Sequence, residues 1–258
     1  MDLKQFLADP EEKPLDRMVA DGGFTAIFRT IACVGDSLSS GEFESLDEDG
    51  KKGYHDYYDY SWGQYLARMA GCKVYNFSRG GMTAKWYLNS FGEENGFFDP
   101  ALAAQAYIFA LGVNDTGGMP CGTIDDICFE DPSKNSETFA GYFGRLLCRY
   151  REISPKSRFF LMTMPRGSKH SDEQAALMRA IADKMDFCYV IDLNRYGPVY
   201  DEAFKKTFYL SNHMNPTGYL LTAKMVASYI DYLVRHNVDD FRQVGFIGTP
   251  YHNSNEKW

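Results

Sequence analysis

The sequence lacks several features that mark whole classes of protein. Its first residues, MDLKQFLADPEEKP, are charged and contain no apolar core, which predicts that they are not a signal peptide. The longest apolar stretch, residues 101–113, is too short to span a bilayer and is interrupted by Gln105. The six cysteines include no C-x-x-C pair, so neither a zinc site nor a disulfide framework is indicated. We therefore expect a cytoplasmic protein without a membrane segment, a metal or a cofactor.

An excess of positive charge is also missing. The chain has 27 basic and 35 acidic residues, and its net charge is −8. Such a charge repels polyphosphate, which argues against nucleic-acid binding and against docking on anionic membranes. The 258 residues are 45% hydrophobic and contain no repeat or linker-like tract. We expect a single domain over residues 1–258, with residues 1–25 as an N-terminal extension and residues 238–258 as a tail.

Short apolar runs alternate with amphipathic stretches along the chain. The runs are nearly continuously apolar, as expected of strands buried on both faces, and cover residues 30–34, 73–77, 107–113, 158–163 and 187–193. Helical spacing of apolar residues is found at residues 60–70, 138–150, 171–185 and 215–236. Asn215 is the expected N-cap of the last helix, and Ser171 with Gln174 has capping-box spacing. Alternation of this kind predicts an α/β fold, a three-layer α/β/α sandwich around a five-stranded parallel sheet.

Small or polar residues follow the predicted strands, where ligands of parallel sheets bind. The first three groups are G-D-S-L-S at residues 35–39, N-F-S-R-G-G at residues 76–81 and G-V-N-D at residues 112–115. A fourth group, S-N-H-M-N-P at residues 211–216, immediately precedes the last helix. A serine is a usable nucleophile only when a neighbouring base takes its proton. Ser37 is therefore a candidate nucleophile and His213 its candidate base.

Together these groups resemble the SGNH (GDSL) hydrolases, a family of esterases and lipases. The resemblance runs from about residue 30 to residue 236, with the groups in the expected order and on the expected elements. It implies a flavodoxin-like topology and a serine esterase that hydrolyses carboxylic esters through an acyl-enzyme at Ser37. It further implies an oxyanion hole made by the Ser37 amide, the Gly81 amide and the Asn114 side chain. Gly80 is the alternative glycine, because the two are adjacent.

The chain departs from the family pattern at one position. The family usually has an aspartate three residues before the histidine, where it orients the imidazole, and this chain has Leu210 there. The remaining candidates for that task are Asp192, Ser211, Asn212 or a backbone carbonyl near Leu210. Otherwise the site is a Ser-His dyad. A non-catalytic small-molecule-binding protein that has lost its acid is the alternative function.

A tyrosine-rich acidic segment follows the candidate nucleophile. Residues 41–62 include four tyrosines within seven positions, from Tyr54 to Tyr60. Aromatic rings with polar groups suit the faces of sugars, whereas an acidic rim disfavours anionic substrates. A carbohydrate O-acyl (acetyl) esterase is therefore the favoured activity, with a small-molecule or glycan ester as substrate. A short-chain lipase or thioesterase is the competing activity, and the oligomeric state is not determined by the sequence.

The sequence also predicts how the two ends of the chain are placed. The apolar residues Val244, Phe246 and Ile247 predict that the tail packs back on the domain, with an edge strand as one possible form. Residues 1–25 are expected either to wrap around the body or to contact a second subunit. Two long loops, residues 39–61 and residues 115–135, are expected to line a pocket at the strand ends. The second contains Gly117, Gly118 and Gly122 and could act as a lid.

Overall fold

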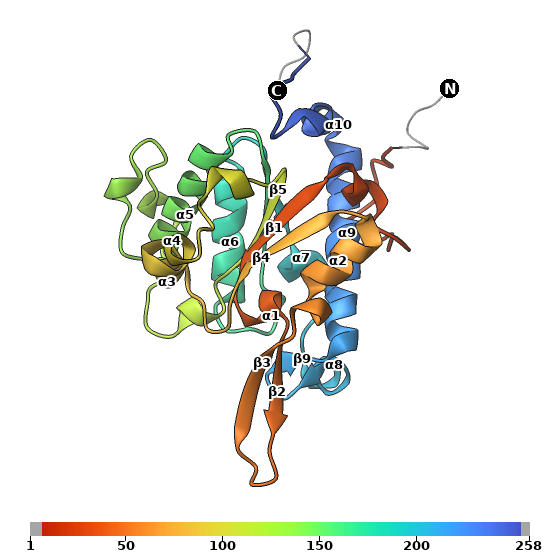
Figure 1. Ribbon diagram of the computed structural model, residues 1–258, viewed down its shortest axis with the longest axis vertical. Coiled ribbons are helices and arrows are strands. Elements are labelled where there is room, and N and C mark those ends of the chain that lie inside the picture. Colours follow the sequence, from red (N-terminus) through yellow and green to blue (C-terminus); the bar gives the residue numbers. More distant parts are fainter. Residues whose placement is uncertain (1–6, 254–258) are drawn as a thin grey trace.

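A five-stranded, all-parallel sheet forms the centre of the protein in the computed structural model, which describes residues 7–253 (Figure 1). Its strand order is β4-β1-β5-β6-β7. The strands are β1 (Thr30–Gly35), β4 (Lys73–Ser78), β5 (Ala106–Ala110), β6 (Arg158–Met162) and β7 (Cys188–Ile191). Each of the five apolar runs therefore forms a strand, and the predicted flavodoxin-like α/β fold is confirmed.

Helices cover both faces of this sheet and create two hydrophobic cores (Figure 1). In β1, Ile31 and Cys33 face one core, while Ala32 and Val34 face the other. Because successive side chains of a strand point to opposite faces, a strand buried on both faces must be continuously apolar. The long helices are α2 (Trp62–Ala70) and α9 (Pro216–His236) on one face, and α5 (Phe139–Ile153) and α6 (Ser171–Ala182) on the other.

Shorter elements connect these layers. The short helices are α1 (Ser37–Ser40), α3 (Ala84–Trp86), α4 (Gly92–Glu94), α7 (Leu193–Tyr196), α8 (Glu202–Phe208) and α10 (Val238–Phe241). Two antiparallel hairpins lie outside the main sheet and consist of β2 (Glu42–Leu46) with β3 (Lys52–Asp56), and β8 (Tyr209–Leu210) with β9 (His213–Met214). A π-helical turn, Tyr87–Phe91, joins α3 to α4. Within residues 7–253, no helix is both long and apolar enough to cross a membrane.

Two predicted helix starts have different outcomes. Asn215 caps α9 as expected, since its side chain accepts a hydrogen bond from the Gly218 amide, and Pro216 occupies the first turn. The capping box predicted for α6 is wrong. His170, in a left-handed conformation, is the residue before the helix, and Ser171 is already helical. Gln174 instead donates to the Gly112 carbonyl and so ties α6 to the end of β5.

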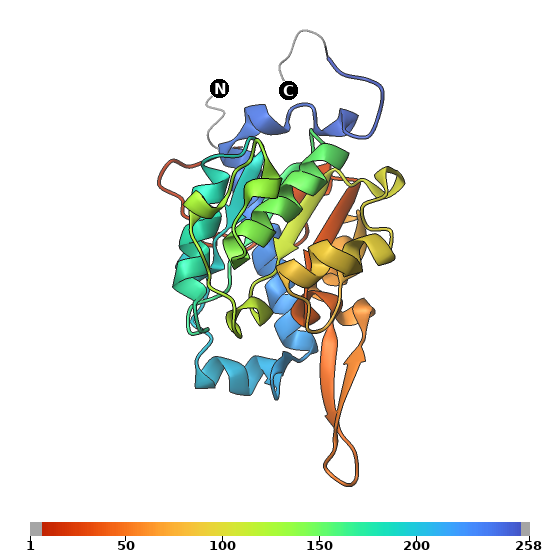
Figure 2. The same cartoon turned by 90° about the vertical axis from the view of Figure 1, so that its left-hand side faces the viewer.

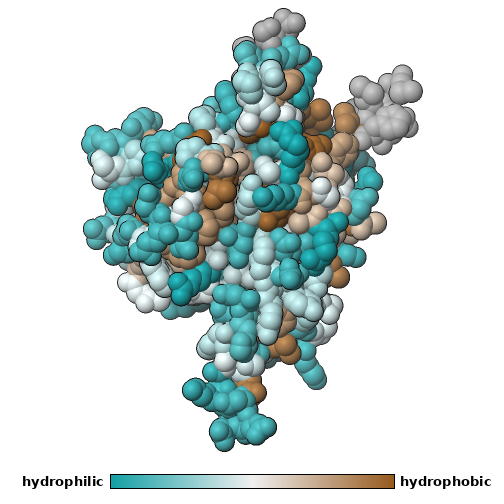
Figure 3. Space-filling model, viewed as in Figure 1, coloured by the Kyte–Doolittle hydropathy of each residue, from teal (hydrophilic) through white to brown (hydrophobic). Residues whose placement is uncertain are grey.

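The β2–β3 hairpin occupies a segment for which only a long loop was expected, residues 39–61. Its strands pair Glu42 with Asp56 and Glu44 with Tyr54. Because side chains alternate along a strand, Glu42 and Glu44 share one face of the hairpin. Phe43 lies on the opposite face and packs against Tyr57, Tyr60 and Tyr219. Figure 2 shows that the hairpin projects beyond the body of the molecule, and Figure 3 shows that its free end is mainly hydrophilic.

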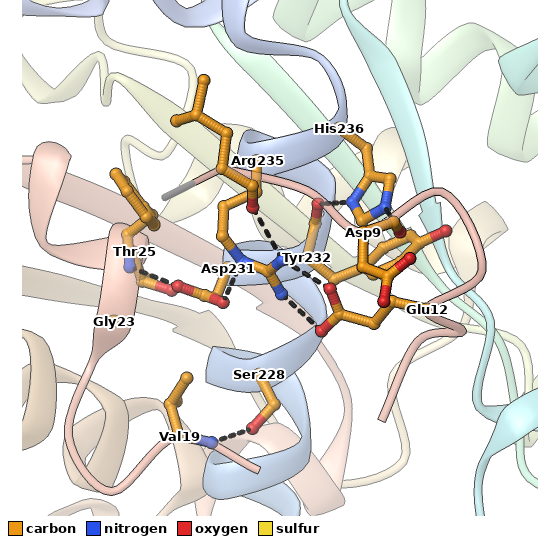
Figure 4. A network of polar contacts seen from close by, with 12 residues as sticks. Asp9, Glu12, Val19, Gly23, Thr25, Ser228, Asp231, Tyr232, Arg235 and His236 are labelled. Carbon is orange, nitrogen blue, oxygen red and sulfur yellow. Dashed lines mark hydrogen bonds and ion pairs between the residues drawn. The ribbon is translucent and has the colours of Figure 1, made fainter. Parts of the chain in front are cut away.

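The N-terminal segment lies along α9 rather than away from the body, and Figure 4 shows the polar contacts that hold it. Arg235 forms ion pairs with Glu12 at 2.6 Å and with Asp231 at 2.8 Å. The Val19 amide donates to Ser228 Oγ, and the Phe24 amide donates to Asp231. The described part of the extension, residues 7–25, therefore wraps the body. Residues 1–6 lie outside the described part of the chain.

The tail returns to the domain, but not as a strand. Residues 238–241 form α10, and Val244–Phe246 form a 3₁₀ turn. Val244 and Ile247 are buried in the core on the α9 face of the sheet. The Val244 carbonyl accepts a hydrogen bond from Gln105 Nε2. The tail thus packs back on the domain as expected, but through a short helix and a turn instead of the edge strand that the sequence left open. Residues 254–258 are not described.

Candidate active site

The four polar groups predicted from the sequence meet at the carboxyl ends of the strands. In the parallel register, Gly35 of β1 lies beside Ser78 of β4 and Ala110 of β5, so these three strands end at the same level. The residues that follow them therefore emerge side by side. α1 also packs against β9, which carries His213. Figure 1 shows α1, the β2–β3 hairpin, α8 and β9 gathered at this one end of the sheet.

Ser37 begins α1, directly after β1. Asp36 precedes it as the N-cap, and its side chain accepts a hydrogen bond from the Leu38 amide at 3.0 Å. Only 7% of Ser37 is exposed. Burial raises the pKa of Asp36 to about 7, although the Leu38 hydrogen bond opposes this shift. Asp36 thus shapes the turn that presents Ser37.

The two glycines after β4 meet different structural demands. Gly81 has a φ of 73°, in the left-handed region where glycine is favoured. Gly80 instead lies against the carboxylate of Glu42, because a Cβ added at this position would lie 2.1 Å from Glu42 Oε2. Gly81 is therefore required by its backbone conformation, whereas Gly80 leaves room for the close approach of the Glu42 carboxylate.

Asn114 and Asp115 connect the end of β5 to the segment that follows these glycines. Asn114 Nδ2 donates to the Met82 carbonyl at 3.1 Å, which uses one of its two N–H groups. Asp115 Oδ1 accepts from the Ala84 amide at 3.0 Å, at the start of α3. Asp115 Oδ2 is buried and has no hydrogen-bond partner. Burial raises the pKa of Asp115 to about 7, partly opposed by the Ala84 hydrogen bond.

Because the pKa of Asp115 is higher in the folded state, the folded protein should lose stability as pH rises. Between the ordinary pKa near 4 and the folded value of about 7, the folded state binds more protons than the unfolded state, so the unfolding free energy falls. Each pKa unit corresponds to roughly 1.4 kcal/mol. We expect the unfolding free energy to fall less between pH 5 and pH 8 in Asp115→Asn than in the wild type. Urea unfolding at each pH measures this free energy. In the control Asp125→Asn, at an exposed residue, the unfolding free energy should fall as much over this pH range as in the wild type. An equal loss in all three proteins would contradict this prediction.

His213 lies in β9 with a carboxylate at each ring nitrogen. Its Nδ1 is 2.9 Å from Glu44 Oε1, and its Nε2 is 3.1 Å from Glu42 Oε1. Burial raises the pKa of Glu42, and the positive charge of His213 opposes that shift. Leu210 pairs with His213 across the small hairpin and is 47% exposed. Both carboxylates come from β2, so the projecting hairpin forms one wall of the site.

Asp192, a sequence candidate for orienting His213, is engaged elsewhere. It forms an ion pair with Arg179 at 2.7 Å and caps α7 by accepting from the Arg195 amide. The Asn212 amide donates to Glu44 Oε1 rather than to the imidazole. The candidates named from the sequence therefore do not contact His213 Nδ1, whereas Glu44 does. Glu44 was missed because it lies 169 positions from His213, although the alternating E-F-E-S before D-E-D-G is typical of a hairpin strand and turn.

An apolar cavity lies beside these residues. Its volume is about 220 Å³, and it opens between α1, the end of β6 and the β8–β9 hairpin. The side chains that line it include Leu38, Met162, Met164, Leu193, Tyr209 and Met214. Apolar walls beside a polar constellation are typical of small-molecule sites.

Comparisons with known proteins agree with this architecture. A family two carbohydrate esterase from Clostridium thermocellum, solved with cellohexaose, is 15% identical with a TM-score of 0.57, over 89% of this chain and 66% of that one. A possible lipase from Chitinophaga pinensis DSM 2588 is 19% identical with a TM-score of 0.52, over 79% of this chain and 98% of that one. At these identities the likeness shows the fold alone. No functionally curated protein matches the chain.

The five-stranded parallel sheet flanked by helices is consistent with the fold of an SGNH-type hydrolase. A model of the GDSL-like lipase/acylhydrolase family matches residues 33–221, and the chain belongs to this family. It is thus a hydrolase that acts on ester bonds.

Proposed function

We propose that this protein is a serine esterase in which Ser37 is the nucleophile and His213 the general base. The observation that carries the proposal is the meeting of α1 with β9 at the carboxyl edge, where the motifs of the family also converge. His213 Nε2 contacts Glu42 in the structure, so the reaction requires this nitrogen to exchange Glu42 for the hydroxyl of Ser37. An ester entering beside Gly80 displaces the Glu42 carboxylate from the same place.

The reaction proceeds by acyl transfer in two balanced steps. Ser37 Oγ attacks the carbonyl carbon while His213 Nε2 takes the hydroxyl proton, and the negative oxygen of the tetrahedral intermediate forms. The bond to the alcohol oxygen then breaks, and His213 returns the proton to the leaving alcohol. A water molecule repeats the sequence on the acyl-enzyme, which releases the carboxylic acid and restores Ser37.

Three donors are proposed to stabilise the negative oxygen. They are the Ser37 amide at the start of α1, the Gly81 amide and the second N–H of Asn114 Nδ2. The contact of Asn114 with the Met82 carbonyl supports this assignment, since it holds the amide beside the glycine turn before any substrate binds. Donors fixed in advance stabilise the developing charge without reorganisation at the moment of reaction.

The alcohol part of the substrate is proposed to be a sugar. Tyr54 supports this, because it is 57% exposed and stands edge-on to His213, with ring centroids 6.1 Å apart. Trp86 is another exposed aromatic residue and lies in α3, shortly after the glycine turn. An exposed aromatic ring beside the base, such as that of Tyr54, suits the apolar face of a sugar. The C. thermocellum esterase of the same fold was solved with cellohexaose, which agrees with this proposal.

The carbohydrate proposal predicts a substrate-dependent effect of Tyr54→Ala. We expect kcat/KM for an acetylated xylo-oligosaccharide to fall about 3- to 10-fold, whereas kcat/KM for p-nitrophenyl acetate changes less than twofold. The reason is that only the sugar ester contacts the aromatic ring. Release of acetate and of p-nitrophenol measures the two rates. Tyr251→Ala, at an exposed tyrosine of the tail, is the control and should leave both rates unchanged.

A short-chain lipase is favoured by one other observation, the apolar cavity of about 220 Å³. A p-nitrophenyl ester series from acetate to decanoate separates the two activities. Preference for acetyl esters together with the Tyr54 effect supports the carbohydrate esterase. A short-chain lipase would give a different result. Tyr54→Ala would then lower kcat/KM equally for both substrates, and the wild-type rate would rise from acetate toward hexanoate.

A further inference from the structure

The strongest unassigned feature of the site is the environment of Glu44. Its carboxylate is 3% exposed, although it lies on a hairpin that projects from the body. Glu44 Oε1 accepts hydrogen bonds from His213 Nδ1 and from the Asn212 amide, each at 2.9 Å. Glu44 Oε2 pairs with Lys52 Nζ at 3.0 Å. Both oxygens are therefore bonded, and the carboxyl group has one fixed orientation.

We propose that Glu44 is the positioning carboxylate of His213 and replaces the acid that is missing at Leu210. The inference rests on the esterase mechanism proposed above. A carboxylate that accepts the Nδ1 proton selects the tautomer whose Nε2 is free to take the serine proton. It also stabilises the imidazolium that forms when His213 has taken that proton. Glu44 acts through His213, so its role is positioning rather than contact with the substrate.

The charge of Glu44 suits this role. Burial alone would raise the pKa of Glu44, but hydrogen bonds from His213, Lys52, Ser211 and Asn212 together lower it to about 2. The carboxylate is therefore ionised over the whole range in which esterases are assayed. Lys52 comes from β3, where it pairs with Leu46 and reaches Glu44 diagonally across the hairpin. The hairpin therefore supplies both the acid and the cation that holds it.

The β2–β3 hairpin also explains why a leucine is tolerated at position 210, where the family usually has the aspartate. Leu210 lies opposite His213 across β8–β9 and is half-exposed, so an acid there would be partly solvated. Glu44 approaches from the neighbouring β2–β3 hairpin, and β2 packs against β9. Ser211, in a left-handed conformation with a φ of 60°, closes the two-residue turn between β8 and β9. This turn brings the Asn212 amide onto the same carboxylate that bonds His213.

Glu44→Gln is the first test, since it preserves the size of the side chain and removes its charge. We expect kcat on p-nitrophenyl acetate to fall about 10³- to 10⁴-fold, as in proteases that lose the equivalent acid, while KM changes less than threefold. Glu44→Asp keeps the charge on a shorter side chain, and its kcat should lie between those of the wild type and Glu44→Gln. The control is Glu48→Gln, at an exposed residue in the turn of the same hairpin, which should retain wild-type kcat.

A second measurement keeps the proposal testable if the variant fails to fold. In wild-type protein with ¹⁵N-labelled histidine, we expect a strongly downfield Nδ1–H resonance from His213, because a charge-assisted hydrogen bond to a carboxylate deshields that proton. Absence of this resonance, or a folded Glu44→Gln that keeps kcat within fivefold of wild type, overturns the role of Glu44. Failure of the esterase mechanism gives a different result. The wild type would then show no ester hydrolysis and no labelling of Ser37 by a fluorophosphonate, whatever the His213 resonance shows.

Discussion

Ser37→Ala should reduce kcat for p-nitrophenyl acetate by about 10⁶-fold, the loss seen when the nucleophile of a serine hydrolase is removed. The reason is that Ser37 is the first residue of α1 and the hydroxyl that directly follows the Asp36 cap. The residual rate would come from binding and from the oxyanion donors alone. Release of p-nitrophenol measures kcat, and mass spectrometry of the protein quenched during turnover should find the acyl group on Ser37 in the wild type only.

A matched variant lies two residues further along the same helix. Ser39 is buried, and its Oγ has no hydrogen-bond partner among the described residues. Replacing an unpaired buried hydroxyl leaves no polar group stranded, so Ser39→Ala should fold and keep kcat within a few-fold of wild type. If Ser37→Ala and the wild type hydrolyse the ester at the same rate, Ser37 is not the nucleophile. The alternative of a binding protein that has lost its catalysis would then be preferred.

Arg235→Met should lower the free energy of unfolding by about 3–5 kcal/mol, the largest loss of stability expected among the substitutions proposed for this protein. Arg235 is 5% exposed and forms ion pairs with both Glu12 and Asp231 (Figure 4). Methionine replaces the aliphatic stem but leaves the buried carboxylate of Asp231 and the partly buried carboxylate of Glu12 without their cation. Asp231 also accepts the Phe24 amide, so the contact between the N-terminal segment and α9 would weaken as well. Urea unfolding at pH 7 measures the change.

The pH dependence of the same variant provides an internal check. The hydrogen bond from Arg235 holds the pKa of Glu12 below its usual value. A lowered pKa contributes stability above the unfolded value near 4.5, and this contribution is lost as pH falls. The difference between the wild type and Arg235→Met should therefore shrink in acid. Lys134→Met, which breaks an exposed pair with Asp131, is the control and should unfold near the wild-type midpoint. A loss for Arg235→Met no larger than that of this control would contradict the prediction.

The main sheet could be predicted closely because burial on both faces leaves a local signal. Each strand must be apolar at every position, and that pattern is visible without knowing its neighbours. Residues 188–191 form β7 within the predicted run of residues 187–193, and α9 begins at Pro216 after Asn215, as the capping pattern indicated. The α6 start was wrong because Gln174 bonds Gly112, 62 positions away, rather than its own helix terminus. A local capping pattern cannot reveal that competing partner.

The hairpin of residues 42–56 was interpreted as a loop for a related reason. One of its faces packs through Phe43 on Tyr219, and the other carries the polar side chains of Glu42 and Glu44. A strand with a single apolar residue directed at the core gives a weak periodic signal, and the acidic composition masked the alternation. The tail behaved similarly. Val244 and Ile247 are buried as their apolar character suggested, but they pack from a turn rather than from an edge strand.

By itself, the sequence determined the α/β class, the order of the strands along the chain and the groups that carry Ser37, Gly80, Gly81, Asn114 and His213. These features are encoded locally, in apolar runs and in short motifs that follow them. The tertiary structure alone decided which carboxylates reach His213. Glu44 and Glu42 contact its two nitrogens, whereas Asp192 pairs with Arg179. The physical reason is that a hydrogen bond depends on distance and direction in space. The fold of the projecting hairpin, rather than proximity in the sequence, brings Glu44 to the imidazole.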